Sequence, residues 1–121
     1  MALPQNRPLS EASVEVQMAD LSTASSAYVV CPWRGTLKRA YSVIANAISS
    51  ADAIWTMEIN GTAVTGVSVT VANSGSAAGD MDSGEPTAVT YLNEGDVIEF
   101  ITDGGSTDTC ITRFTVVIER D

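Results

Sequence analysis

The chain has 121 residues, of which 45% are hydrophobic and 17% are charged, and this length suits one domain with a single core. It contains no histidine, and six basic against fifteen acidic residues give a net charge of −9. The missing histidine excludes Ser-His-Asp and Cys-His catalysis and histidine-ligated zinc. The negative charge disfavours a nucleic-acid binder that works by phosphate neutralisation. We therefore expect no enzyme, no cofactor and no nucleic-acid partner.

Nothing in the sequence predicts a membrane partner. No apolar run approaches the roughly 18 residues needed to span a bilayer. Residues 1–10 (MALPQNRPLS) lack the apolar stretch of a secretory signal, so we expect synthesis in a cytoplasm. Cys31 and Cys110 lie in apolar β-like runs. In a reducing compartment they are expected to be buried thiols, although the sequence leaves a disulfide between them open.

Residues 1–12 are predicted to form an extended N-terminal arm, followed by one domain over residues 13–121. Pro4 and Pro8 disfavour the interior of a helix or strand. The arm is either a disordered leader or a segment that becomes ordered on a partner. In the second case its candidate interface residues are Leu3, Pro4, Arg7, Pro8 and Leu9.

The first half of the domain alternates apolar and polar residues, as a half-buried strand does. Strands are expected over residues 13–19, 26–31, 35–48, 53–60 and 67–72. In the third of these, Leu37, Tyr41, Val43 and Ala45 share one face, while Lys38, Ser42 and Asn46 share the other. Asn60-Gly61 predicts a type I′ hairpin, since both residues tolerate positive φ. Residues 45–53 leave one short helical turn open as an alternative.

The second half adds three strands, over residues 87–92, 96–102 and 110–119. Residues 73–85 are predicted to be a long polar loop, residues 93–95 a turn, and residues 103–109 the loop that closes the last hairpin. About eight strands, with no helix beyond the alternative turn, predict an all-β fold, an antiparallel β-sandwich that is jelly-roll-like. The expected core residues are Trp55, Met57, Ile59, Tyr91, Ile98, Phe100, Phe114, Val116 and Ile118.

Several segments together resemble small β-sandwich structural proteins of tailed bacteriophages, of the head decoration (cement) type. They are residues 34–41 (RGTLKRAY), 56–71 with the Ile59-Asn60-Gly61 turn, 74–80 (SGSAAGD), 93–98 (NEGDVI) and 103–107 (DGGST). The resemblance covers roughly residues 13–119 as a pattern of strands and loops. It implies a jelly-roll-like fold, a homotrimer and a position on the outside of an icosahedral shell, and it brings no catalytic motif.

A long stretch of the chain is purely acidic. Between residues 80 and 108 there are eight carboxylates and no basic residue. Asp80, Asp82 and Glu85 form a weak candidate for a Ca²⁺ site, because carboxylate oxygens are the ligands this ion prefers. The position twelve residues along, Tyr91, is not the glutamate of an EF-hand. The alternative is a solvated acidic loop that keeps the protein soluble.

Half of the positive charge lies within six residues, at Arg34, Lys38 and Arg39. This cluster is either a contact for acidic loops of a partner or ordinary surface charge near a turn. Trp33 follows Pro32 in the same turn, and it either anchors an interface or caps the end of the sandwich. We therefore take Trp33, Arg34, Lys38 and Arg39 as candidate interface residues beside those of the arm.

These observations favour a bacteriophage virion structural protein that binds the assembled head and stabilises it non-covalently. The expected partner is the major capsid protein, and the expected location is the capsid surface. The alternative is a carbohydrate- or receptor-binding module of a phage fibre, because jelly rolls also serve as lectins.

Overall fold

The computed structural model describes residues 10–121, which form nine β-strands and no helix. Their bounds are β1 Glu11–Met18, β2 Ser25–Val30, β3 Gly35–Ile44, β4 Ala53–Ile59, β5 Thr62–Val71, β6 Met81–Gly84, β7 Tyr91–Leu92, β8 Val97–Thr102 and β9 Thr112–Arg120. Because residues 10–121 form no helix, this part of the chain has no helix that could cross a membrane.

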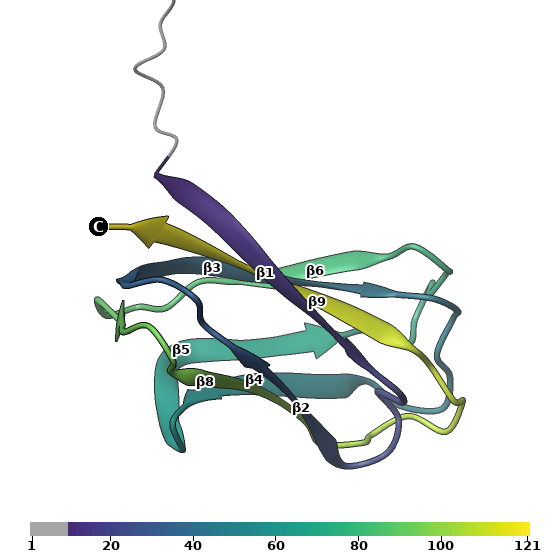
Figure 1. Cartoon of the computed structure of the whole chain (residues 1–121). Coiled ribbons are helices and arrows are strands. Elements are labelled where there is room, and N and C mark those ends of the chain that lie inside the picture. The colour runs from purple at the N-terminus through teal and green to yellow at the C-terminus, as the bar shows by residue number, and fades with distance from the viewer. Residues whose placement is uncertain (1–9) are drawn as a thin grey trace, which may run out of the picture.

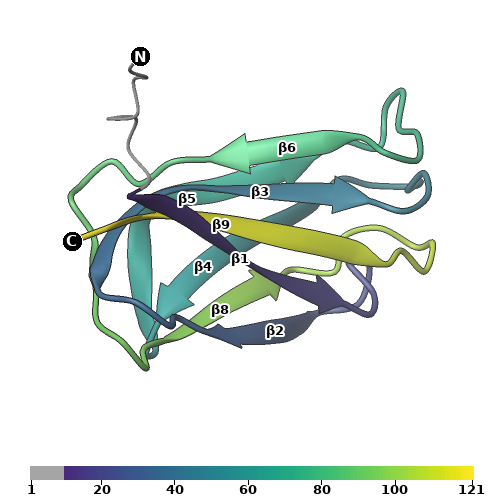
Figure 2. The same ribbon diagram turned by 45° about the horizontal axis from the view of Figure 1, so that its top comes forward.

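The strands form two antiparallel sheets that pack face to face (Figure 1). Sheet A has the order β1-β9-β3-β6, with β7 pairing with β3 beyond one end of β6, and sheet B has the order β2-β8-β4-β5. The chain crosses between the sheets at most of its connections, and Figure 2 shows the two layers joined by these crossings. This is the jelly-roll arrangement, so the predicted fold class is confirmed, with nine described strands instead of eight.

The inward faces of both sheets fill the core with side chains. Trp55, Phe100 and Phe114 are fully buried and contact one another, with ring centroids 4.3 to 5.7 Å apart. The indole Nε1 of Trp55 donates a hydrogen bond to Oγ of buried Ser42, 3.0 Å away, so its polar atom is satisfied. The period-two alternation predicted for the first half of the domain is present in β1 and β4, and β9 shows the same alternation.

The hairpin between β4 and β5 forms at the predicted place. Asn60 and Gly61 have φ of 50° and 85°, and Ile59 pairs with Thr62 across the turn. These positive φ values are those of a type I′ turn. The Asn60 side chain also ties the hairpin to β8, since its Oδ1 accepts a hydrogen bond from the Val97 amide at 2.9 Å.

The prediction for β3 is wrong beyond Leu37. The register with β9 shifts between Leu37 and Arg39, so Lys38 is an extra residue in a β-bulge. Because side chains alternate with period two, one extra residue sends the rest of the strand to the opposite faces. Ala40, Ser42 and Ile44 are therefore buried, whereas Tyr41 and Val43 lie on the outer face of sheet A. The strand also ends at Ile44, well short of residue 48.

Two connections also differ from the sequence prediction. Met81–Gly84 was expected to be loop but pairs with β3 as β6. Residues 103–109 were expected to close a hairpin, whereas β8 lies in sheet B and β9 in sheet A, so this loop crosses the sandwich.

Asp20 anchors the far end of that crossing, because its Oδ1 accepts hydrogen bonds from the amides of Ser22 and Cys110, both at 2.9 Å. Burial acts to raise the pKa of Asp20, but these bonds and one from Thr23 outweigh it and lower the pKa.

The beginning of the domain lies slightly earlier than predicted. Glu11 and Ala12, assigned to the arm, are part of β1, and the carbonyl of Ser10 accepts a hydrogen bond from the Arg120 amide at 2.7 Å. The arm candidates Leu3, Pro4, Arg7, Pro8 and Leu9 lie outside the described residues. Cys31 and Cys110 are both buried and free, so no disulfide joins them.

Candidate functional site

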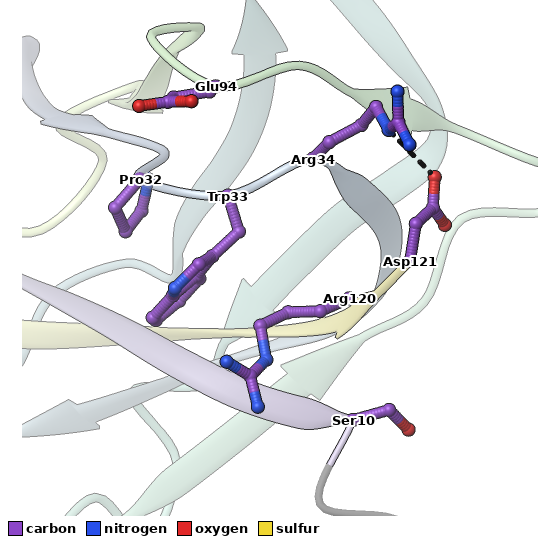
Figure 3. Close-up of a pocket in the computed structure, with 7 residues that line it drawn as sticks. All are labelled: Ser10, Pro32, Trp33, Arg34, Glu94, Arg120 and Asp121. Carbon is purple, nitrogen blue, oxygen red and sulfur yellow. Dashed lines mark ion pairs between the residues drawn. The ribbon is translucent and has the colours of Figure 1, made fainter.

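A shallow hollow of about 730 Å³ lies at the end of the sandwich where β1 begins and β9 ends (Figure 3). Two backbone hydrogen bonds bring its walls together: Arg120 N to Ser10 O at 2.7 Å and Asp121 N to Arg34 O at 3.1 Å. We call this the Trp33 hollow. Its lining residues are Ser10, Pro32, Trp33, Arg34, Glu94, Arg120 and Asp121.

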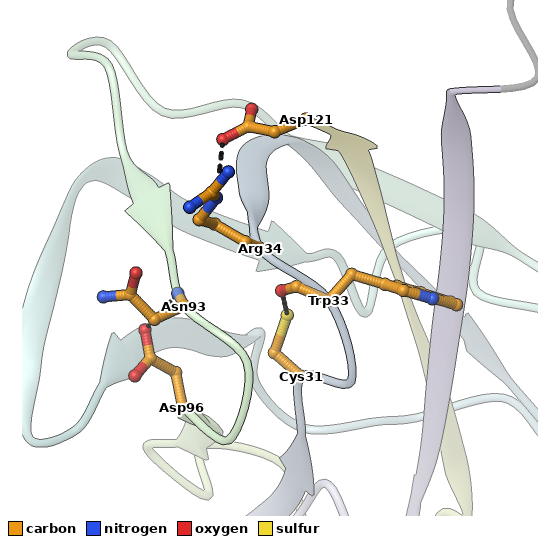
Figure 4. A network of polar contacts seen from close by, with 6 residues as sticks. All are labelled: Cys31, Trp33, Arg34, Asn93, Asp96 and Asp121. Carbon is orange, nitrogen blue, oxygen red and sulfur yellow. Dashed lines mark hydrogen bonds and ion pairs between the residues drawn. The ribbon is translucent and has the colours of Figure 1, made fainter.

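The loop that carries Trp33 is fixed by Cys31. The Cys31 amide and carbonyl bond to the backbone of Asp96 and Gly95, both at 2.8 Å, and its Sγ donates to the Trp33 carbonyl at 3.0 Å (Figure 4). Burial raises the pKa of the Cys31 thiol, with Asp96 adding to the effect, so the thiol keeps the proton that it donates. The Trp33 loop is therefore tied to the turn before β8.

Asp96 holds that turn in shape. Its carboxylate accepts hydrogen bonds from the Asn93 amide at 2.7 Å and from the Asn60 side chain at 2.9 Å. These bonds favour the charged form and lower the pKa of Asp96. One carboxylate thus joins the β7–β8 turn to the β4–β5 hairpin at the same end of the molecule.

Trp33 caps the sandwich and still keeps part of its ring exposed. The ring packs against the core residues, and the Arg120 guanidinium lies 5.6 Å from its centroid. Such a cation–π contact contributes about 0.5–1 kcal/mol at an exposed site. Figure 3 shows Arg120 extended toward the indole while Arg34 turns to Asp121. Arg120 lies 87 positions after Trp33 in the chain, so no local sequence pattern indicates that the two residues meet.

The predicted basic cluster is divided among different contacts. Arg34 pairs with Asp121 at 3.3 Å and Lys38 pairs with Glu119 at 3.5 Å. Arg39 faces outward on β3 after the bulge and forms no ion pair with any described residue. Exposed pairs of this kind contribute between zero and about 1 kcal/mol each. Of the candidate interface residues within 10–121, Trp33 and Arg34 therefore share the hollow, whereas Lys38 and Arg39 line a separate one.

The weak Ca²⁺ candidate does not form a site. Asp80 accepts a hydrogen bond from the Ala77 amide at 2.9 Å, within its own turn. Asp82 is half-buried on β6 opposite Ser42, and burial, with a smaller effect of Asp80, raises its pKa. Within residues 10–121, no three His, Cys, Asp or Glu side chains are grouped as a metal ion requires. An inward carboxylate on a short edge strand instead discourages pairing with another sheet.

The most exposed large apolar side chains lie on a segment outside the candidate interface residues. Residues 86–91, which we call the ridge, comprise most of the connection after β6 and the first residue of β7, and on them Val89 is 70% and Tyr91 is 74% exposed. Tyr91 was expected in the core, and this prediction is wrong. Leu92, the next residue, is the one that β7 turns inward, with 1% exposure. The expected strand over residues 87–92 is thus reduced to Tyr91–Leu92.

Comparison with known proteins identifies the fold. No protein-family model matches the sequence, and curated proteins give no significant match. Among solved structures, a family 35 carbohydrate-binding module from Clostridium thermocellum has a TM-score of 0.52 at 14% identity, covering 86% of this chain and 90% of its own. A CBM35 from Cellvibrio japonicus Abf62 gives 0.52 at 10% identity, covering 91% and 99%. A chain of the cyanophage Pam1 capsid asymmetric unit gives 0.57 at 13% identity, covering 100% and 93%.

These neighbours share the small β-sandwich, and their identities are too low to indicate more than the fold. The phage protein and the carbohydrate-binding modules correspond to the two functions that the sequence left open.

Proposed function

We propose that this protein is a bacteriophage virion structural protein that binds the assembled head from outside and stabilises it non-covalently. The observation that supports this most is the likeness to the Pam1 capsid chain, which extends over the whole of this chain. The surface is in keeping with it, since the core is closed and apolar side chains such as Val89 and Tyr91 face solvent. In this proposal the protein functions through its outer surface and has no catalytic role.

The proposed mechanism is thermodynamic linkage between the binding of this protein and the assembly of the shell. A protein that binds the assembled shell and not free subunits adds its binding free energy to the assembled state by mass action. The partner is the major capsid protein, and a homotrimer engaging three equivalent sites gains from effective concentration, so weak single contacts suffice. The net charge of −9 keeps the protein soluble in the host cytoplasm before it docks on the virion.

Co-sedimentation tests the proposal. Purified protein is mixed with phage heads assembled without it, the heads are pelleted at several salt concentrations, and a carbohydrate-binding module of family 35 serves as the control of matched fold. We expect this protein to pellet with the heads and the control to stay in solution. We also expect the decorated heads to break open at a higher temperature. Protein that remains in the supernatant under every salt condition would refute head binding.

Carbohydrate or receptor binding is the second candidate, and the Trp33 hollow favours it. A partly buried indole lies there with Glu94 and Asp121, an aromatic surface beside carboxylates that suits a sugar. Screening wild-type protein and Trp33→Ala on a glycan array, with and without Ca²⁺, separates the two functions. Glycan binding that is lost in Trp33→Ala would favour this candidate, whereas head binding without any glycan response favours the first.

A further inference from the structure

The basic residues are confined to one of the two sheets. Beyond residue 9 they are Arg34, Lys38, Arg39, Arg113 and Arg120, all in β3, in β9 or in the loop before β3. The four strands of sheet B contain no lysine or arginine. The outer face of sheet B therefore carries acidic groups without a cation, while sheet A carries both signs.

Arg39 is the guanidinium best placed to meet another molecule. Arg34, Lys38 and Arg113 each have a carboxylate within 3.5 Å, but no carboxylate of the described chain lies within 4.0 Å of Arg39. It lines an open hollow of about 440 Å³ between the β3 bulge and the ridge, which Val89 also lines. The Arg39 guanidinium, which pairs with no carboxylate of residues 10–121, thus lies beside an exposed apolar side chain in a hollow that Glu85 also lines.

The ridge is firmly held even though its apolar side chains are exposed. The Thr87 amide bonds to the Thr65 carbonyl at 3.0 Å, and the Leu37 amide bonds to the Thr90 carbonyl at 2.9 Å. Gly66 of β5 lies so close that an added Cβ would be 2.6 Å from the Thr87 side chain. A pre-organised apolar surface loses little entropy when it binds, and this makes it a good interface centre.

The outer face of sheet B has the complementary chemistry. Glu58 on β4 pairs directly with Glu99 on β8, and like charges directly opposite each other on a sheet are destabilising. Tyr28 of β2 lies on the other side of Glu99 and is 60% exposed. Val30 and Val97 form the next exposed pair along the same two strands. Two carboxylates that form no ion pair within residues 10–121 thus lie next to three apolar side chains.

We propose that the ridge of one copy docks on the outer face of sheet B of a second copy, with Arg39 against Glu58 and Glu99 and with Val89 and Tyr91 against the apolar side chains. Arg39 relieves the repulsion between the two glutamates, and the ridge covers the apolar surface beside them. Because the two surfaces are different, the contact is head-to-tail and leaves each copy able to bind another. The inference goes beyond head binding and stands independently of it.

A charge-reversal cycle tests the contact. Sedimentation velocity over a range of concentrations compares wild type with Arg39→Glu, with Glu99→Arg and with the double variant. Each single change should weaken the association constant at least tenfold, equal to about 1.4 kcal/mol, and the double variant should recover most of the loss. Arg113→Glu, the same charge change on the outer face of sheet A, is the matched control and should associate like wild type.

A second readout separates docking from folding. Glu99→Arg removes the repulsion with Glu58, so the isolated chain should unfold at a higher temperature although it associates less. Tyr91→Ser should weaken association with little change in unfolding, because its side chain is exposed. A monomeric wild-type protein at all concentrations, equal losses in Arg39→Glu and Arg113→Glu, or no recovery in the double variant would each overturn the proposal. Association without co-sedimentation with heads would refute head binding alone.

Discussion

Replacement of Gly66 by alanine tests how closely the ridge is packed against β5. Gly66 has a φ of +91°, and an added Cβ would lie 2.6 Å from Cγ2 and Oγ1 of Thr87 and 2.8 Å from its amide nitrogen. Positive φ costs an alanine about 1–2 kcal/mol, and forcing atoms into a filled space costs about 1–3 kcal/mol more. We expect Gly66→Ala to lower the free energy of unfolding by about 2–5 kcal/mol.

Gly61→Ala is the matched control, since Gly61 has a φ of +85° but no heavy atom within 4 Å of an added Cβ. Gly61→Ala should lower the free energy of unfolding only by the cost of the positive φ, about 1–2 kcal/mol. Urea unfolding followed by tryptophan fluorescence, at one fixed protein concentration, measures both variants. Thr87→Ala in the Gly66→Ala background should recover part of the loss, because it removes the two side-chain contacts and leaves the one with the amide. A loss in Gly66→Ala no larger than in Gly61→Ala would refute the close packing of the ridge.

Three further predictions concern buried and titrating groups. Ser42→Ala leaves the buried Trp55 Nε1 without its hydrogen-bond acceptor, so it should lower the free energy of unfolding by about 1–3 kcal/mol. Urea unfolding measures this loss, and an unchanged unfolding midpoint would contradict the prediction. The pKa of Asp82 is raised by burial, so its charge destabilises the fold above that pKa. Asp82→Asn should thus raise the unfolding temperature at neutral pH, and the gain should vanish below pH 3.8, where both folded and unfolded wild type are protonated. Asp20 and Asp96 have lowered pKa values in the folded state. The stability that these two carboxylates supply is complete above pH 3.8 and is lost as the pH falls through their folded pKa values. In a series of thermal unfolding measurements at different pH, Asp96→Ala should therefore reduce the fall of the unfolding temperature at acid pH.

Much of the fold could be predicted because side-chain alternation determines which face of a strand is buried. Trp55 and Met57 on β4 followed this rule, and Asn60-Gly61 marked the hairpin from local backbone preference alone. The rule fails where the backbone inserts a residue. The bulge at Lys38 placed Tyr41 and Val43 outside, and no local pattern distinguishes a bulged from a regular strand.

The rest depends on pairings between distant segments. After Met81 the segment Met81–Gly84 is polar and carries no strand signal, and it becomes β6 by pairing with the free edge of β3. The loop over residues 103–109 has turn chemistry that serves a hairpin and a crossing equally well. For the same reason, the meeting of Trp33 with Arg120 and the pairing of Glu58 with Glu99 required the structure.

In the proposed function this β-sandwich acts through its outer surface on an assembled shell. The most direct measurement compares its binding to intact heads with its binding to unassembled major capsid protein, with both partners at the same subunit concentration. We expect saturable binding to heads and none to free subunits. Equal binding to both, or binding to neither, would contradict it.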